Sequence, residues 1–292
     1  MKSLKGKKCL VTGAASGIGR AIALGLCRKG AHVYLLDIDQ QKLQPVVEQC
    51  AALHDGQVGV TAIGKVCDLA NPAQTSAAIE EMLQTWNGLD VLINNAGVVY
   101  CGPTQNMTAS QWDWVMGINL LAPIQLIRQL LPALLDREEA HILNVCSIGG
   151  LVSRRDTAAY NASKFGLVGL SESLRQEYWR RGLGVTALCP GFVKTDLLKS
   201  GISGHPRKPM PQPPPWACTT PEHVAAVGID AILRNRGVVL ITPLAHLVWA
   251  LKRLSPGFFD YLMREGWRKK KSRRPAPAPA APTAVTAPLE SR

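Results

Sequence analysis

The stretch KCLVTGAASGIGRAIALGL, residues 8–26, decides the fold. Residues 8–12 have the apolar pattern of a short buried strand, glycines follow at positions 13, 17 and 19, and residues 20–26 are typical of a helix. This order suits phosphate binding, because glycines let the backbone approach a pyrophosphate and a helix N-terminus offers free N–H groups. The spacing differs from the common G-x-G-x-x-G fingerprint. The alternative is that these glycines only mark a turn.

An acidic residue ends the next expected strand, residues 32–36. Asp37 lies about 20 residues after the glycines, where a carboxylate binds the ribose 2′-hydroxyl of a dinucleotide. The same carboxylate would repel a 2′-phosphate, so the sequence favours NAD over NADP. The alternative is that Asp37 or Asp39 only caps the following helix.

Strand and helix patterns alternate through the rest of the chain. We expect further strands at 58–66, 90–94, 141–146, 184–189 and 238–241, and helices at 72–86, 108–135, 160–181 and 221–234. Such alternation predicts an α/β fold, in which a parallel sheet carries helices on both faces.

Small or polar residues follow the ends of several expected strands, which is where open α/β sheets bind ligands. They are Asp68 with Leu69, Asn95 to Gly97, Ser147, and Val193 with Thr195. The alternative is that these residues only form the turns or loops after the strands. Asn119 stands in an apolar stretch and, if buried, needs hydrogen-bond partners, in a structural or a catalytic role.

The segment YNASK, residues 160–164, opens the helical pattern at 160–181. Tyr160 and Lys164 are four residues apart and share one face of a helix. A lysine ammonium beside a phenol is expected to lower the phenol's pKa from about 10, so that Tyr160 exchanges a proton near neutral pH. A surface Tyr and Lys at helical spacing is the alternative.

Composition limits the compartment and the chemistry. The chain has 292 residues, of which 47% are hydrophobic, so it can form a sizeable core. Its eight cysteines form no C-x-x-C pair and no Cys/His cluster, which predicts free thiols in a reducing, cytoplasmic setting and no metal site. Apolar strand residues begin at Cys9, which leaves no room for a signal peptide, and the longest apolar tract is too short to span a bilayer.

The positive charge is concentrated near the C-terminus. Residues 251–274 carry nine basic and two acidic residues, a net +7 of the chain's +12. Apolar residues recur there at roughly helical spacing, so residues 244–274 are predicted to form an amphipathic basic segment on an anionic membrane surface. Packing on the domain or on a partner subunit is the alternative. Nucleic acid is not expected, because no recognition motif accompanies the charge.

Three segments thus divide the chain: a dinucleotide-binding catalytic domain at 1–243, the basic segment at 244–274, and a Pro/Ala-rich tail at 275–292 that is expected to be disordered. The Gly- and Pro-rich stretch at 200–217 is either a mobile lid over a substrate or a plain linker.

Together these motifs resemble the short-chain dehydrogenases/reductases. The resemblance covers about residues 4–241 and rests on TGAASGIG at 12–19, Asp68-Leu69, NNAG at 94–97, Asn119, Ser147, YNASK and PGFVKT at 190–195. It implies a doubly wound, seven-stranded, Rossmann-like sheet in three layers. It also implies an NAD(P)-dependent enzyme that transfers a hydride between nicotinamide and a secondary alcohol or ketone.

The resemblance assigns roles to residues. Tyr160 would be the general acid/base, Lys164 would lower its pKa and hold the nicotinamide ribose, and Ser147 would bind the reacting oxygen. Asn119 would anchor a water in the proton relay. The implied cofactor contacts are Gly13, Ser16, Gly17, Ile18 and Gly19 at the pyrophosphate, Asp68 and Leu69 at the adenine, Asn95, Tyr160 and Lys164, and Val193 and Thr195 at the carboxamide.

The resemblance also bears on partners. Family members often form dimers or tetramers through the helices that contain Asn119 and Tyr160. Hydrophobic-basic tails occur in members that act on lipophilic alcohols such as steroids and retinoids, which favours such a substrate here. Arg154 and Arg155 could instead favour an acidic substrate, or belong to a solvated loop. The alternatives for the whole protein are an NADPH-dependent carbonyl or 3-oxoacyl reductase and a non-catalytic NAD-binding scaffold at a membrane.

Overall fold

The computed structural model describes residues 1–53, 60–205, 210 and 212–268. The chain divides into two compact units, Met1–Ala250 and a second that begins at Leu251. The tail expected at 275–292 and the end of the basic segment, 269–274, lie outside the described residues. The three-segment division therefore stays a prediction.

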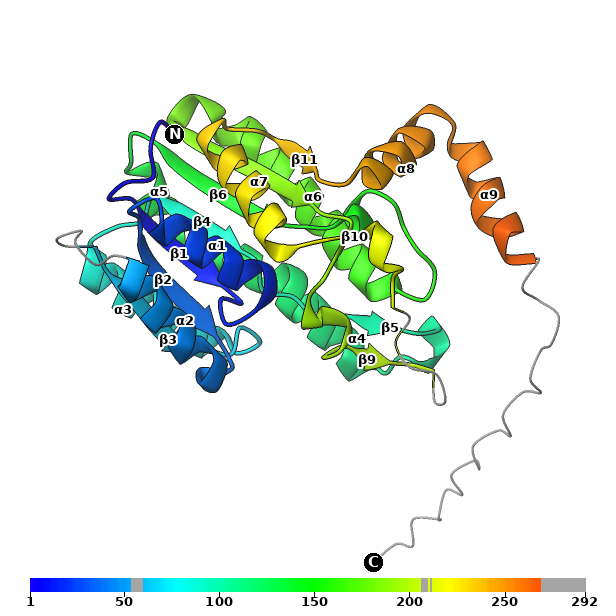
Figure 1. Ribbon diagram of the computed structural model, residues 1–292, viewed down its shortest axis with the longest axis horizontal. Helices are drawn as coiled ribbons and strands as arrows, with labels where there is room; N and C mark the ends of the chain where they lie inside the picture. The colour runs from blue at the N-terminus through cyan, green and yellow to red at the C-terminus, as the bar shows by residue number, and fades with distance from the viewer. Residues whose placement is uncertain (54–59, 206–209, 211, 269–292) are drawn as a thin grey trace, which may run out of the picture. The chain divides into compact units, whose positions relative to one another are not determined.

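Seven parallel strands form one sheet in the order β11-β7-β6-β4-β1-β2-β3 (Figure 1). Their bounds are β1 (Lys8–Thr12), β2 (His32–Asp37), β3 (Ala62–Val66), β4 (Val91–Asn94), β6 (Ala140–Val145), β7 (Leu183–Cys189) and β11 (Val238–Leu240). The chain runs outward from β1 to β3 and then crosses to β4 on the other side of β1. The order therefore reverses between β1 and β4, which is where such sheets bind ligands.

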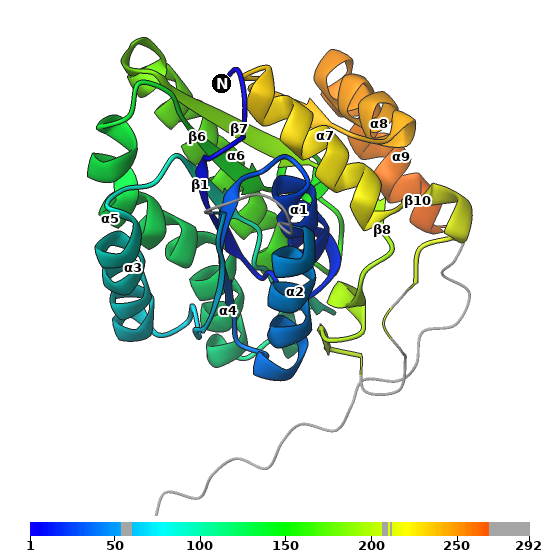
Figure 2. The same ribbon diagram turned by 60° about the vertical axis from the view of Figure 1, so that its left-hand side comes forward.

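Helices cover both faces of the sheet (Figures 1 and 2). One face carries α1 (Gly17–Cys27), α2 (Gln40–Leu53) and α7 (Pro221–Leu233), and the other carries α3 (Pro72–Trp86), α5 (Ala122–Leu135) and α6 (Ala158–Tyr178). The expected α/β fold, a doubly wound seven-stranded parallel sheet in a three-layer Rossmann-like arrangement, is confirmed.

Alternation along the strands builds a core on each face. Cys9 and Val11 of β1 belong to the core beside α1, whereas Leu10 between them belongs to the core beside α3. Strands of a parallel sheet are buried on both faces, which is why they read as nearly continuous apolar runs.

Local capping fixes several helix bounds. The Asn71 side chain accepts hydrogen bonds from two first-turn N–H groups of α3, at 3.0 and 3.2 Å, and Pro72 occupies the first turn, where its missing N–H costs nothing. Thr220 caps α7 by accepting a bond from the backbone N–H of His223 at 3.2 Å. The predicted helix at 72–86 is confirmed.

A long apolar helical run leads into the second core. It consists of α4 (Ala109–Met116), a π-helical turn at Gly117–Leu121 and α5. Among the described residues it is the one helix whose length of 27 residues, and mean hydropathy of 1.4 over an 18-residue window, would allow it to cross a membrane. Because Leu126, Leu130 and Leu134 pack into the core beside α3, we interpret it as a core helix.

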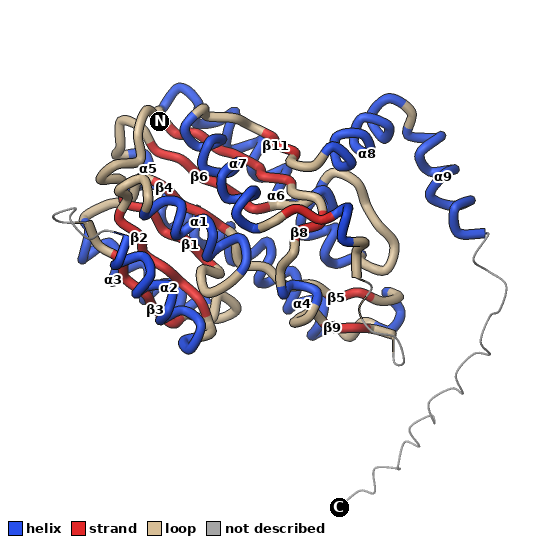
Figure 3. The backbone as a smooth tube through the Cα atoms, in the orientation of Figure 1, coloured by secondary structure: helices blue, strands red, loops and turns tan. Residues whose placement is uncertain are grey.

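Two short parallel ladders lie outside the main sheet and were not expected from the sequence (Figure 3). β5 (Tyr100–Cys101) pairs with β9 (Ile202–Ser203), and β8 (Phe192–Val193) pairs with β10 (Cys218–Thr219). They fasten parts of the Gly- and Pro-rich stretch to the domain. Residues 206–209 and 211 of that stretch lie outside the described residues, so the lid stays a prediction.

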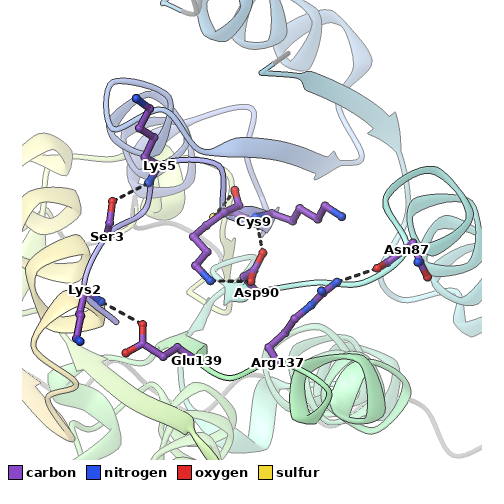
Figure 4. A network of polar contacts seen from close by, with 10 residues as sticks. Lys2, Ser3, Lys5, Cys9, Asn87, Asp90, Arg137 and Glu139 are labelled. Carbon is purple, nitrogen blue, oxygen red and sulfur yellow. Dashed lines mark hydrogen bonds and ion pairs between the residues drawn. The ribbon is translucent and has the colours of Figure 1, made fainter. Parts of the chain in front are cut away.

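Polar contacts hold the amino ends of β1 and β4 together, at the edge opposite the strand ends that carry the motifs (Figure 4). Asp90 accepts hydrogen bonds from Lys7 Nζ at 3.1 Å and from the backbone N–H of Lys8 at 2.9 Å. Arg137 donates to the carbonyl of Asn87 at 2.8 Å, beyond the C-terminus of α3. These contacts set the register of the strands whose far ends form the candidate site.

His141 is a buried histidine on β6. Its Nε2 lies 2.8 Å from the Thr186 hydroxyl, which itself donates to the carbonyl of Arg236, so the network assigns the proton to Nε2. Burial lowers the pKa of His141 from its ordinary value of 6.5 to about 3. The folded protein therefore keeps this ring neutral across the working pH range.

We expect acid to destabilise the protein through His141. The unfolded chain binds a proton near pH 6.5 and the folded chain does not until about pH 3, so the contribution is complete above 6.5 and is lost as the pH falls. Between pH 7.5 and 5.5 this group should cost about 1.4 kcal/mol of unfolding free energy. Urea unfolding at fixed protein concentration measures it, with His141→Gln as the comparison. An identical pH dependence in both proteins contradicts the assignment.

The C-terminal part of the described chain forms α8 (Pro243–Leu254) and α9 (Pro256–Arg268). Ser255 separates the two helices and Pro256 begins the second, since proline lacks the N–H that would continue the first one. The basic segment was expected as one amphipathic stretch, and the break between two helices is a finding of the structure.

Candidate active site

Three glycines shape the turn between β1 and α1. Gly13 and Gly17 have φ values of 63° and 53°, which side-chain-bearing residues rarely adopt. A methyl group at Gly19 would lie 2.0 Å from the carbonyl oxygen of Gly13. The glycines are therefore required by the backbone path, and the turn is more than punctuation.

The end of β4 is fastened to this turn. Asn95 donates through Nδ2 to the carbonyls of Thr12 and Gly13 at 2.9 and 3.0 Å. The Thr12 hydroxyl accepts the backbone N–H groups of Asn95 and Ala96 at 3.0 and 3.1 Å. These bonds fix the backbone at the point where the strand order reverses. The Asn95 side chain therefore has a structural role, in holding the glycine turn against the end of β4.

The first turn of α1 faces the same place. Ser16 is the exposed N-cap residue, and no side-chain cap bond from it is present in the described structure. The first-turn N–H groups thus remain available to an anion. A methyl group at Gly17 would lie 3.1 Å from the Thr195 side chain, so Thr195 borders the turn. Ile18 and Val193 are half-buried and pack against the core.

The carboxylate of Asp37 lies beside the glycine turn. One oxygen accepts the backbone N–H of Ala15 at 2.9 Å and the other accepts that of Asp39 at 3.0 Å. Asp39 accepts the N–H of Lys42 and pairs with its ammonium at 2.7 Å. The capping alternative thus applies to Asp39, whereas Asp37 points to the turn.

Asp68 and Leu69 follow β3 beside Asp37, since the N–H of Cys67 donates to the carbonyl of Asp37 at 2.8 Å. Leu69 is half-buried against the core. Ile38 is 66% exposed directly after Asp37, which is unusual for a large apolar side chain. Ile38 was not predicted as a site residue, although an isoleucine that follows the acidic end of a strand is visible in the sequence.

The two proton-handling groups meet at the ends of β6 and α6. A methyl group at Gly149 would lie 3.3 Å from Tyr160 Cε1 and 3.4 Å from Ser147 Oγ, so the phenol ring and the hydroxyl are neighbours. Ser147 also accepts the backbone N–H of Gly149 at 3.0 Å. Burial raises the pKa of Tyr160, and the adjacent Ser147 hydroxyl opposes that rise. The expected lowering of this pKa by Lys164 is therefore not found in the protein alone, where desolvation of the phenolate dominates.

Lys164 lies one helical turn from Tyr160, with Nζ 5.9 Å from the centre of the tyrosine ring. The ammonium is buried and donates to the carbonyl of Val145 at 2.9 Å. Burial lowers the pKa of Lys164. The two side chains share one face, as the spacing predicted, and the surface alternative is wrong.

Asn119 is fully buried in the π-helical turn before α5. It accepts the backbone N–H of Val98 at 2.8 Å and donates to the Val98 carbonyl at 2.9 Å and to the Ser163 hydroxyl at 3.2 Å. A methyl group at Gly97 would lie 3.3 Å from Asn119 Oδ1 and 3.6 Å from Lys164 Nζ. Asn119 is thus both a structural clamp and a neighbour of the lysine.

The contacts join the predicted residues into two linked groups. The cofactor group comprises the glycine turn with Asn95, Asp37 and Thr195, and the catalytic group comprises Ser147, Tyr160, Lys164 and Asn119. Gly97 lies between them, beyond Asn95 and beside Lys164. The sequence missed Thr12, Val98 and Val145, because two of these act only through their backbones.

The turn fits a dinucleotide. Its glycines leave no Cβ between the backbone and an incoming pyrophosphate, and the N-terminus of α1 offers N–H donors there. A groove of about 570 Å³ between α1 and α7 is lined by Arg20, Arg28, Glu222 and neighbouring residues and shares no residue with this site.

The loop before α6 carries the two arginines noted in the sequence. Arg155 pairs with Asp156 at 3.3 Å. The Arg154 guanidinium lies over the Phe192 ring, 5.9 Å from its centre. Phe192 directly follows the turn after β7, so Arg154 is the one of the two that reaches toward the site.

The chain is similar in sequence to a known enzyme family and to individual members of it. A sequence profile of the family described as short chain dehydrogenase matches residues 7–204. The chain is 33% identical over 200 residues to the CLA biosynthesis dehydrogenase/reductase of Lactiplantibacillus plantarum, covering 68% of each chain. It is 30% identical over 270 residues to the ketoacyl reductase HetN of a Nostoc species, covering 90% of each.

Solved structures of the same family have the same fold as this chain. A short-chain dehydrogenase/reductase from Burkholderia phymatum in complex with NAD superposes with a TM-score of 0.75 at 27% identity, over 98% of this chain and 100% of that one. A metagenomic short-chain oxidoreductase in complex with NADP gives 0.67 at 31% identity, over 82% and 98%. The chain belongs to the short-chain dehydrogenase/reductase family and is an NAD(P)-binding oxidoreductase.

Proposed function

We propose that the protein transfers a hydride between a nicotinamide cofactor and a secondary alcohol or ketone, with Tyr160 as the general acid/base. The observation that carries this proposal is that the Tyr160 ring and the Ser147 hydroxyl lie side by side next to Gly149, with Lys164 one turn away. A half-buried phenol, a buried hydroxyl and a buried ammonium on one side of a glycine turn have the chemistry of a proton-handling site.

Each residue has a defined task in this mechanism. Ser147 orients the oxygen of the substrate, and Tyr160 exchanges a proton with that oxygen. Lys164 contributes positive charge beside the phenol, and Asn119 fixes the backbone at Val98 and borders Lys164. The cofactor supplies the hydride chemistry when it is bound, while the protein supplies geometry and proton handling.

The raised pKa of Tyr160 supports the reductive direction as a second candidate. Burial keeps the phenol protonated in the protein alone, and a protonated phenol can donate to a carbonyl oxygen. The similarity to a relative named as a ketoacyl reductase supports the same alternative, a carbonyl or 3-oxoacyl reductase. A lipophilic substrate, steroid- or retinoid-like, remains our proposal for the oxidative direction.

We propose NAD as the preferred cofactor and NADP as the weaker one. The Asp37 carboxylate lies against the glycine turn, where it meets the adenosine ribose and repels a 2′-phosphate. A non-catalytic NAD-binding scaffold gains nothing from a half-buried tyrosine beside a buried lysine, so we rank it behind both enzymes.

A homodimer or tetramer is proposed through the helices that contain Asn119 and Tyr160. Leu121, on the π-helical turn, and Phe165, on α6, are large apolar side chains that stay 57% and 38% exposed in one chain. A second copy would cover them. We propose a cytoplasmic location with the C-terminal segment as a peripheral membrane contact.

An activity screen tests the function. The protein should oxidise secondary alcohols with NAD, or reduce the matching ketones with NADH, at a rate that Ser147→Ala lowers by about 100-fold. Steroid-like alcohols and 3-oxoacyl thioesters form two arms of the screen. Cofactor binding without turnover on any substrate would favour the scaffold and contradict the proposal.

A further inference from the structure

Exposed apolar side chains concentrate at the C-terminal end of the described chain. Thirteen large apolar side chains are exposed among the described residues, and seven of them lie within the twenty residues from Leu244 to Met263. Scattered exposed apolar residues are ordinary on a protein surface, but a cluster marks a surface that binds something.

Helix α8 has two apolar faces. Ala245 is buried and Trp249 packs into a core cluster of the domain, so one face holds the helix in place. Leu247 and Leu254 are 66% and 85% exposed on another face and are seven residues apart, two helical turns. Leu244 is exposed three residues before Leu247 and extends the same stripe.

Helix α9 is also amphipathic. Phe258 and Leu262 are exposed four residues apart, and Met263 lies beside them. The acidic Asp260 is paired with Arg264 at 3.1 Å. Helix α9 carries two acidic and two basic residues, so the net positive charge of the segment comes from Lys252 and Arg253 on α8 and from the basic residues at 269–274, which follow α9 in sequence.

We propose that α8 and α9 each insert an apolar face into the interface of an anionic bilayer, and so hold the enzyme on the membrane surface. This inference rests on the membrane contact proposed above and assigns it to two helices, and it does not depend on the oxidoreductase activity. The exposed leucines and phenylalanine supply buried apolar area, and the basic residues supply attraction to acidic headgroups.

The helices fit the interface better than a membrane span. With 12 and 13 residues, α8 and α9 are about 18 and 20 Å long, whereas the hydrocarbon core is about 30 Å thick. Each also carries charged residues, which an interfacial helix keeps on its wet side.

Charge favours a bilayer over a second copy of the chain. A twofold interface would bring two identical segments together, each with the net +7 of residues 251–274. Such segments repel each other at physiological salt, while an acidic membrane attracts both. The experiment below also tests whether the segment binds a second copy of the chain instead.

Vesicle sedimentation of the full chain tests the proposal. The protein should pellet with phosphatidylcholine vesicles that contain 30% phosphatidylserine (about the acidity of a cytoplasmic leaflet), and at least about tenfold less with pure phosphatidylcholine or in 0.5 M salt. The double variant Phe258→Glu/Leu262→Glu should lose binding at least about tenfold. Trp179→Ser is the matched control, because Trp179 is also exposed but lies after α6, and it should bind like wild type.

A triple Lys269→Gln/Lys270→Gln/Lys271→Gln variant separates charge from apolar insertion, and should weaken binding only to the acidic vesicles. Circular dichroism confirms that each variant is folded. Wild-type binding by the Phe258/Leu262 variant overturns the proposal. A second result also overturns the proposal: the wild-type protein does not bind vesicles, and the Phe258/Leu262 variant has a lower molar mass than wild type by light scattering. That result would show that the exposed apolar face is an interface between copies of the chain. Turnover with a water-soluble substrate is measured in parallel, so that loss of enzymatic activity is distinguished from loss of membrane binding.

Discussion

Replacing Tyr160 with phenylalanine is expected to lower kcat by about 10³-fold, within the range of general acid–base catalysis. The change removes one oxygen atom, the one that would exchange the substrate proton beside Ser147. The aromatic ring stays in place beside Lys164. Cofactor affinity, measured by NADH fluorescence titration, should therefore change by no more than about threefold.

Tyr178→Phe is the matched control for this variant. Tyr178 lies at the other end of the same helix, half-buried against the core beside α3. Its loss of a hydroxyl should leave kcat within about twofold, since it touches none of the candidate site residues. Turnover of Tyr160→Phe within tenfold of wild type contradicts the assignment of the general acid/base.

Replacing Asp37 with alanine is expected to lower the ratio of kcat/KM for NAD to that for NADP by about 100-fold. A hydrogen bond to a charged group contributes about 1.5–3 kcal/mol, and loss of the carboxylate also removes its repulsion of a 2′-phosphate. Because Asp37 also accepts the N–H of Ala15 in the glycine turn, both cofactors should bind more weakly in absolute terms.

Two companion variants locate the cause. Asp37→Asn keeps an acceptor for Ala15 and loses the charge, so it should gain activity with NADP while retaining part of the activity with NAD. Asp39→Ala loses the cap of α2 and the ion pair with Lys42, and should leave the cofactor ratio unchanged. A wild-type enzyme that prefers NADP, or a ratio unaffected by Asp37→Ala, argues against the role given to this carboxylate.

Much of the fold follows from local sequence signals. The glycine turn, the predicted helix at 72–86 and the cap at Thr220 rest on backbone requirements that a few residues express. The two-residue ladders β5–β9 and β8–β10 could not be foreseen, because two residues are too few to show a strand pattern and the paired strands lie about 100 and 26 residues apart. The break after α8 is visible in the sequence as Ser255, Pro256 and Gly257. It was not predicted, because apolar residues keep a roughly helical spacing across these positions.

The site shows a similar division. The shared face of Tyr160 and Lys164 follows from helical spacing, and the free thiols were expected: all eight cysteines lie in the described residues, seven of them buried and Cys218 half-buried. The direction of the Tyr160 pKa could not be predicted, because burial is a property of the packed molecule. The contact of Lys164 with the Val145 carbonyl is also invisible in sequence, since any residue at position 145 has that oxygen.

Transfer of deuterium from (4R)-[4-²H]NADH and from (4S)-[4-²H]NADH, each measured separately with the best ketone of the activity screen, tests the central claim most directly. We predict one deuterium at the carbinol carbon for each NADH consumed with one of the two labelled cofactors and none with the other, and loss of the transfer in Tyr160→Phe. Wild-type protein that binds NADH tightly yet leaves the label on the cofactor with every ketone would contradict the account.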